Sequence, residues 1–233
     1  GFGINTVVDL PEARSSLLPS REWKKRSRGE VWFPGDTVNI GIGQGDILVT
    51  PLQLATAVAI LANRGKVVSP RMLKSSSQLM PDSKEQLLPD IDQIAAAYWD
   101  LIIESMRMVV HRGDQEWGEN GTAWAYIGRD ISYQMAGKSG TAQIVEIAQG
   151  ELYDADELEE RQRKNAWFVA FAPLEKPTIA LAVMVENGGG GSEFAAPIAR
   201  KVLDYYLRDY ESASELEMRA ELVSKSVQQP SLR

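Results

Sequence analysis

The sequence contains no cysteine, and His111 is its single histidine among 233 residues. The absence of cysteine excludes disulfides, thiolate chemistry and cysteine-based zinc sites. One histidine excludes a multi-histidine metal site, and any Ser-His-Asp triad would have to use His111. His111 falls where a helix is predicted to end, so we expect a helix-terminal cation or a surface residue. We expect no metal and no other cofactor.

Long apolar runs and an excess of positive charge are also absent. No run of eighteen apolar residues occurs, so no membrane span is predicted, and no signal peptide is recognisable. Lys and Arg number 25 against 32 Asp and Glu, for a net charge of −7. This balance argues against a nucleic-acid partner, which needs a basic face. The first residues, "GFGINTVVDLPE", include no initiator Met, and we expect the chain to be a piece of a longer protein.

Two segments show the signals of helices. The first begins with Thr50 as N-cap, Pro51 in the first turn and Gln53 completing a T-x-x-Q capping box, and Gly65 stops it. The second covers about residues 93–110, with apolar residues at helical spacing. We expect loops at residues 74–90 and 111–130.

Strands are expected mainly in the second half of the chain. Three candidates cover residues 131–147, 166–172 and 178–186. The last two are apolar on both faces, which predicts a sheet covered on both sides. A closing helix over 192–210 follows them. Earlier in the chain, we expect the basic stretch 21–30 to be a solvated loop and residues 66–73 to be a short strand.

The stretch "GKSGTAQ" places a lysine, two hydroxyls and two glycines within 137–143. It is not a P-loop, because Ser132 stands where that motif needs glycine. Likewise "GIGQGD" at 41–46 is not a dinucleotide fingerprint, since Asp46 replaces its third glycine. We therefore expect a loop beside a helix at 41–46.

Two interpretations of the K-S-G-T cluster follow from its residues alone. An edge strand could dock an extended peptide, with Lys138 and the hydroxyls of Ser139 and Thr141 holding a carboxylate. Gly140 would let another backbone approach closely. Alternatively, the cluster is a solvent-exposed edge on which lysine prevents aggregation. The residues themselves favour neither interpretation.

Lys138-Ser139-Gly140 also fits K-[ST]-G, the third motif of the serine penicillin-binding enzymes. "FPGDTVNIGIGQGDILVTPLQLATAVAILANRG", "NGTAW", "WFVAFAP" and "VENGGGGS" accompany it in a matching order and spacing. Over residues 1–208 the chain resembles the C-terminal part of the penicillin-binding protein 2 family, class B peptidoglycan D,D-transpeptidases of cell-wall elongation. Residues 209–233 remain as a charged tail. The resemblance implies an α+β, penicillin-binding-protein/β-lactamase-like fold, an antiparallel sheet flanked by helices, here its C-terminal portion.

The family's other two motifs are missing. No serine of this sequence has lysine three positions on, as S-x-x-K requires, and none has asparagine two positions on, as S-x-N requires. The resemblance therefore implies that the nucleophile lies upstream of this chain, and we expect the chain alone to be inactive.

The resemblance assigns roles to the four residues of the cluster. Thr141 would give its backbone N–H to the oxyanion hole. The substrate-binding set would be Ser139, Gly140 and Thr141. The hydroxyls of Ser139 and Thr141 would hold the substrate's terminal carboxylate. Lys138 would supply positive charge and a hydrogen bond to the second motif. A loop beginning at Glu146 and ending at Asn165 would border the active-site mouth, as a gate or, as we favour, a solvated excursion.

Partners and location also follow from the resemblance. It implies peptidoglycan stem peptides and β-lactam antibiotics as ligands. It implies a rod-shape SEDS-family glycosyltransferase and other elongation-complex proteins as partners. The place would be the periplasmic face of the bacterial inner membrane, reached through an N-terminal anchor outside this chain. Two alternatives stay open: a D,D-carboxypeptidase that uses water as acceptor, and a non-catalytic β-lactam sensor or scaffold of the same fold.

Overall fold

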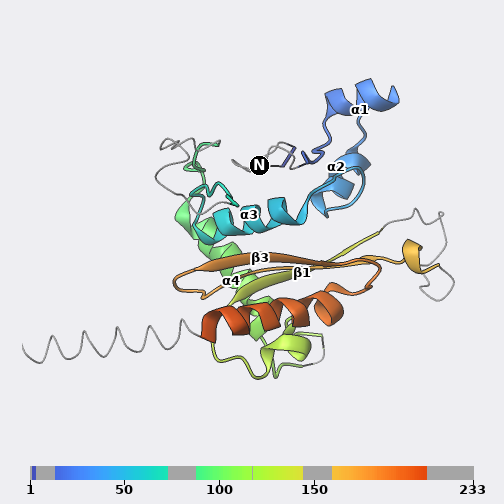
Figure 1. Cartoon of the computed structure of the whole chain (residues 1–233). Coiled ribbons are helices and arrows are strands. Elements are labelled where there is room, and N and C mark those ends of the chain that lie inside the picture. Colours follow the sequence, from blue (N-terminus) through green and yellow to red (C-terminus); the bar gives the residue numbers. More distant parts are fainter. Residues whose placement is uncertain (1, 4–13, 73–87, 117, 144–158, 209–233) are drawn as a thin grey trace, which may run out of the picture. The chain divides into compact units, whose positions relative to one another are not determined.

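The computed structural model describes residues 2–3, 14–72, 88–116, 118–143 and 159–208 (Figure 1). Residue contacts divide the chain into two units, Gly1–Ala199 and Arg200–Arg233. The elements, in chain order, are α1 (Arg21–Arg28), α2 (Pro34–Gly41), α3 (Pro51–Ala62), α4 (Ala96–His111), the π turn η1 (Trp124–Gly128), β1 (Ala136–Ala142), the 3₁₀ turn η2 (Glu160–Gln162), β2 (Asn165–Ala172), β3 (Ile179–Val185) and the π turn η3 (Gly191–Ala195). Residues 196–208 are also helical.

The second unit is described from residue 200 to 208. These residues are helical, and Leu203 and Leu207 are buried. Arg200 and Asp204, one helical turn apart, form an ion pair with 2.5 Å between Nε and Oδ1. The predicted closing helix is thus confirmed as far as residue 208, and the predicted charged tail 209–233 lies outside the described residues.

The three strands form one antiparallel sheet in the order β1-β2-β3. All three strands were predicted, but β1 begins at Ala136, five residues later than the expected start at residue 131, and residues 131–135 form no strand. Residues 144–147 of the first predicted strand lie outside the described residues. Ala172 pairs with Ile179, so residues 173–178 make the short connection between β2 and β3. Within the described residues β1 and β3 are therefore the outer strands.

Helices cover the sheet. α3 packs on β2 and β3, α4 packs on β1, and η3 contacts all three strands. Figure 1 shows α3 on one face of the sheet and the η3 turn on the other. This arrangement explains why β2 and β3 are apolar on both faces, as the sequence analysis expected.

The core of the first unit lies between the sheet and the two long helices. Its buried members come from α3, α4, β1 and β2, and they are Val58, Ala62, Ile103, Met106, Ala136 and Phe171. On the other face of β2, Phe168 is also completely buried. A Cβ on Gly137 would lie 2.7 Å from the Phe168 ring, so this ring requires glycine at position 137.

The two predicted helices are confirmed. α3 begins after Thr50, whose hydroxyl accepts the N–H of Gln53 at 3.2 Å, while the Gln53 side chain accepts the N–H of Thr50 at 3.0 Å. The chain turns away after α3 through Gly65, which has φ +92°. α4 covers the second predicted helix, beginning three residues later than expected.

The prediction of a loop at 21–30 is wrong, because residues 21–28 form α1. The Ser20 hydroxyl caps this helix by accepting the N–H of Trp23 at 3.1 Å. Gly29, at φ 71°, closes it by donating its N–H to the carbonyl of Lys25. Helix α2 was also missed. Pro34 opens it, and Asp36 accepts the N–H of Phe33 at 2.7 Å.

One further expectation needs correction, and the expected place of His111 at the end of a helix is confirmed. Residues 66–72 form no strand, because the N–H of Val67 is taken by the Asp90 carboxylate at 2.7 Å rather than by a neighbouring strand. His111 ends α4, as expected, and its Nε2 accepts the N–H of Met135 at 3.1 Å.

Candidate active site

The K-S-G-T residues lie on the outer strand β1. Lys138 pairs with Val169 of β2, and Thr141 pairs with Ala166. Lys138 and Thr141 are exposed, whereas Ser139 and Gly140 are half-buried. The four residues thus lie on an accessible edge of the sheet, as both interpretations of the sequence required.

The hydrogen bonds show which backbone groups face outward. The Thr141 carbonyl accepts Nε2 of Gln44 at 3.0 Å, and the Ser139 carbonyl accepts Nζ of Lys138 at 2.7 Å. Neither donor belongs to β2, so both carbonyls point away from it. In an antiparallel strand the N–H and C=O of one residue point to the same side. The N–H groups of Ser139 and Thr141 therefore face the open edge, where a ligand could reach them.

Side chains alternate along β1. Lys138 lies on the same face as Ala136, which belongs to the core beneath α3 and α4. Ser139 and Thr141 lie on the opposite face. The Lys138 ammonium reaches around to the strand edge, where it binds the Ser139 carbonyl. The sequence-predicted residues are thus brought together at one edge, although their side chains leave the strand in opposite directions.

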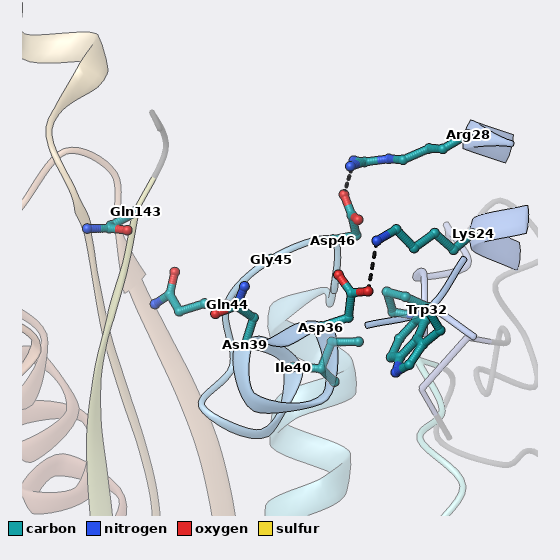
Figure 2. Close-up of a pocket in the computed structure, with 11 residues that line it drawn as sticks. Lys24, Arg28, Trp32, Asp36, Asn39, Ile40, Gln44, Gly45, Asp46 and Gln143 are labelled. Carbon is teal, nitrogen blue, oxygen red and sulfur yellow. Dashed lines mark hydrogen bonds and ion pairs between the residues drawn. The ribbon is translucent and has the colours of Figure 1, made fainter. Parts of the chain in front are cut away.

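A polar cavity of about 440 Å³ lies at the end of β1. Gln143 lines it from the strand side, and the remaining lining residues come from the segment that contains α1 and α2. Figure 2 shows Gln44 extending from the loop after α2 toward the strand that carries Gln143. None of the four K-S-G-T residues lines this cavity.

Two ion pairs hold the far wall of the cavity. Nζ of Lys24 lies 2.7 Å from Oδ2 of Asp36, and Arg28 pairs with Asp46. Lys24 is only 5% exposed, and Glu30 lies 3.5 Å from its ammonium. The hydrogen bond from Lys24 is the main cause that lowers the pKa of Asp36, and the hydrogen bond from the N–H of Phe33 is the second. The same hydrogen bond with Asp36 raises the pKa of Lys24.

Three residues at this site escaped the sequence analysis. Gln44 lies between Gly43 and Gly45, both at φ 76°, so the G-Q-G pattern marked a tight turn that projects one polar side chain. Gln143 follows directly on the strand. Gly191, in the "ENGGGGS" run, lies so close to the sheet that a Cβ there would be 2.2 Å from the Trp167 carbonyl oxygen and 2.4 Å from that of Gly140.

Metal ligation has no support in the described part of the chain, where no group of three or more His, Asp or Glu side chains is arranged to hold an ion. Among the same residues, no helix combines the length and apolar character that crossing a bilayer requires.

Lys138-Ser139-Gly140 fits the K-[ST]-G motif of the penicillin-binding enzymes, and here it lies on an outer strand of an antiparallel sheet backed by helices. Residues 1–204 match the family described as "Penicillin binding protein transpeptidase domain". The chain belongs to this family, and its fold is the α+β transpeptidase fold that the sequence resemblance implied.

Two curated relatives give the degree of similarity. The peptidoglycan D,D-transpeptidase MrdA of Haemophilus influenzae is 41% identical over 209 residues, which is 89% of this chain and 31% of the relative. MrdA of Escherichia coli K12 is 37% identical over 212 residues, which is 89% of this chain and 32% of the relative. The chain thus spans about a third of the length of these relatives.

Solved structures agree. Pseudomonas aeruginosa PBP2, in complex with WCK 5153, has a TM-score of 0.74 and 40% identity over 89% of this chain and 41% of its own. Helicobacter pylori PBP2, in complex with MreC, has a TM-score of 0.68 and 29% identity over 90% of this chain and 34% of its own. The predicted resemblance to penicillin-binding protein 2 is therefore confirmed.

Proposed function

We propose that this chain supplies the substrate-binding edge strand of a peptidoglycan D,D-transpeptidase that crosslinks stem peptides during cell-wall elongation. The outward-facing backbone edge of β1 at Ser139 and Thr141 carries the proposal. That edge presents two N–H groups side by side with two hydroxyl side chains. A ligand made of oxygen acceptors, such as a carboxylate or an oxyanion, fits such a surface.

The reaction needs a serine nucleophile, and this sequence has no S-x-x-K motif. In the proposed reaction, a serine from elsewhere in the protein forms a bond to the carbonyl carbon of the penultimate D-alanine. The terminal D-alanine leaves with a proton on its nitrogen. An amine of a second stem peptide then attacks the acyl-serine, which forms the crosslink and frees the serine.

Each residue of the cluster has a part in this proposal. The Thr141 N–H stabilises the oxyanion that forms at the attacked carbonyl, where one such donor typically contributes about a hundredfold to a thousandfold in rate. The hydroxyls of Ser139 and Thr141 bind the terminal carboxylate. Lys138 adds positive charge beside them. Gly140 adds no side chain at the edge, so the substrate backbone can approach.

Location and partners extend the proposal. The Helicobacter pylori neighbour was solved as a complex with MreC, and another neighbour belongs to a peptidoglycan synthase complex that couples polymerisation to crosslinking. We therefore assign the same kind of elongation-complex partners to this protein, including a SEDS-family glycosyltransferase. Its place would be the periplasmic face of the inner membrane.

The experiment measures acylation of the complete gene product by a fluorescent penicillin. Thr141→Val removes one hydroxyl and keeps the shape of the side chain. A hydrogen bond to a charged group contributes about 1.5–3 kcal/mol, so acylation should slow roughly ten- to hundredfold. Thr178→Val is the matched control, because Thr178 is exposed in the connection between β2 and β3. Equal rates for Thr141→Val and the control would remove Thr141 from the site.

The chain by itself gives a second test. The 233 residues alone should stay unlabelled by the same penicillin. A label that survives boiling in detergent and maps to a serine of this sequence would contradict the proposal that the nucleophile comes from elsewhere in the protein. Analysis of the reaction products of the complete protein distinguishes crosslinking from D,D-carboxypeptidase activity. A protein that binds penicillin but releases no D-alanine from stem peptides would be a sensor.

A further inference from the structure

Gln44 joins two segments that are far apart in the sequence. Its side-chain Nε2 donates a hydrogen bond to the carbonyl of Thr141 at 3.0 Å, across 97 positions of the chain. This carbonyl lies on the outer edge of β1, on the same side as the Thr141 N–H. Gln44 therefore contacts the strand at the residue to which the proposed function gives the oxyanion donor.

The loop that carries Gln44 has a fixed shape. Gly43 and Gly45 both have φ 76°, a conformation in which side chains other than glycine's are strained. The N–H of Gln44 donates to the Asn39 carbonyl at 2.8 Å, and the N–H of Gly43 donates to that of Ile40 at 2.9 Å. The backbone of Gln44 is thus tied back to α2, and its side chain begins from a defined point.

The α2 segment is itself tied to α1 on both sides of Gln44. Before it in the sequence, Asp36 binds the buried Lys24. After it, Asp46 binds Arg28. Figure 2 shows both pairs on the side of the cavity away from Gln143. The side-chain amide of Gln44 is consequently carried by a loop that is held in place on both sides.

We propose that Gln44 is a positioning residue that holds the Thr141 end of β1 in the geometry that acyl transfer requires. The inference rests on the proposed function of Thr141. An oxyanion donor acts only within a narrow range of distance from the developing charge, and small displacements of catalytic groups cost large factors in rate. A hydrogen bond at the neighbouring carbonyl restrains this part of the outer strand, which has β2 on only one side.

The test uses the complete gene product and the variant Gln44→Leu, which keeps the approximate size of the side chain and removes the donor. Gln134→Leu is the matched control, since Gln134 is exposed just before β1. We expect the first-order acylation rate by a penicillin to fall about three- to tenfold in Gln44→Leu, as for loss of one neutral hydrogen bond. The dissociation constant of the non-covalent complex and the unfolding midpoint should match those of the control.

A second readout does not depend on catalysis. Amide hydrogen exchange over residues 138–143 should be faster in Gln44→Leu than in the control. Gln44→Glu should be slower in acylation than Gln44→Leu, because a carboxylate would face the carbonyl. These measurements separate a structural role, which would shift the unfolding midpoint, from positioning.

The outcomes distinguish the inference from the function on which it rests. If the parent protein is not acylated at all, the proposed function fails, and the exchange experiment still tests whether Gln44 restrains the strand. If the parent is acylated and Gln44→Leu reacts at the same rate, the positioning role is wrong. A faster Gln44→Leu would also overturn it, since the amide would then compete with the substrate for the carbonyl.

Discussion

Replacing Gly191 by alanine should distort the strand that carries the K-S-G-T residues. A Cβ at this position would lie 2.2 Å from the Trp167 carbonyl oxygen and 2.4 Å from that of Gly140, whereas real Cβ atoms essentially never come closer than 3.0 Å. The distance between residue 191 and the Trp167 carbonyl oxygen must therefore grow by at least about 0.8 Å. Both neighbours are backbone atoms of paired strands, so they have no rotamer by which to move away.

The expected loss can be estimated from this displacement. Inserting a methyl group into a packed region typically costs about 1–3 kcal/mol, and we expect Gly191→Ala to lose at least that much free energy of unfolding. If the strand moves instead of the turn, Thr141 moves with it. A misplacement of about 1 Å can cost roughly a hundredfold in rate. Acylation by a penicillin should therefore fall together with stability.

The neighbouring glycine provides the control. A Cβ on Gly190 would lie 3.9 Å from its nearest neighbours, both in Glu193, and Gly190 has the ordinary φ of −83°. Gly190→Ala should be neutral, or should stabilise by up to about 1 kcal/mol through the unfolded chain. Urea unfolding and acylation rates of the two variants are compared side by side in the complete gene product. Equal unfolding midpoints for Gly190→Ala and Gly191→Ala would refute the steric reasoning.

Two other predictions concern single hydrogen bonds. Because its partner Lys24 lowers the pKa of Asp36, the charged form of Asp36 stabilises the fold above the ordinary carboxyl pKa of about 3.9, and this contribution disappears as the pH falls through the lower folded value. Asp36→Asn keeps the acceptor for the N–H of Phe33. The urea midpoint of this variant should be lower than the parent's between pH 5 and 8, and the two midpoints should approach each other below about pH 4. A difference in midpoint that does not change with pH would contradict the linkage. His111→Phe removes the acceptor for the buried N–H of Met135 and should lower the free energy of unfolding by about 1–3 kcal/mol. Amide hydrogen exchange at Met135 should become faster. An unchanged exchange rate would show that this hydrogen bond does not protect the Met135 amide.

The sequence predicted those elements whose signals are local. The capping box at Thr50 and Gln53 located the start of α3, and apolar runs located β2 and β3. Helix α1 was missed because it has no apolar stripe for periodicity to detect. Its one buried residue is Lys24, and only the caps at Ser20 and Gly29 mark its ends.

The candidate site was predicted only in part for the same reason. K-S-G-T is contiguous, so its place on an outer strand could be inferred from a few residues. The contact between Gln44 and Thr141 joins positions 97 apart, and no local pattern encodes it. A run of glycines such as 188–191 lets a chain turn tightly, and only the neighbours in space show that Gly191 is pressed against β1 and β2. The catalytic roles of Lys138 and Thr141 remain predictions.

The two side-chain donors at the edge of β1 also determine what the edge repels. An added β-strand would bring N–H groups that need the carbonyls of Ser139 and Thr141, and these already accept from Lys138 and Gln44. A strand from another molecule would have to displace an ammonium and an amide before it could pair. A carboxylate brings no donors and displaces neither. These two contacts thus disfavour edge-to-edge aggregation of an otherwise accessible strand.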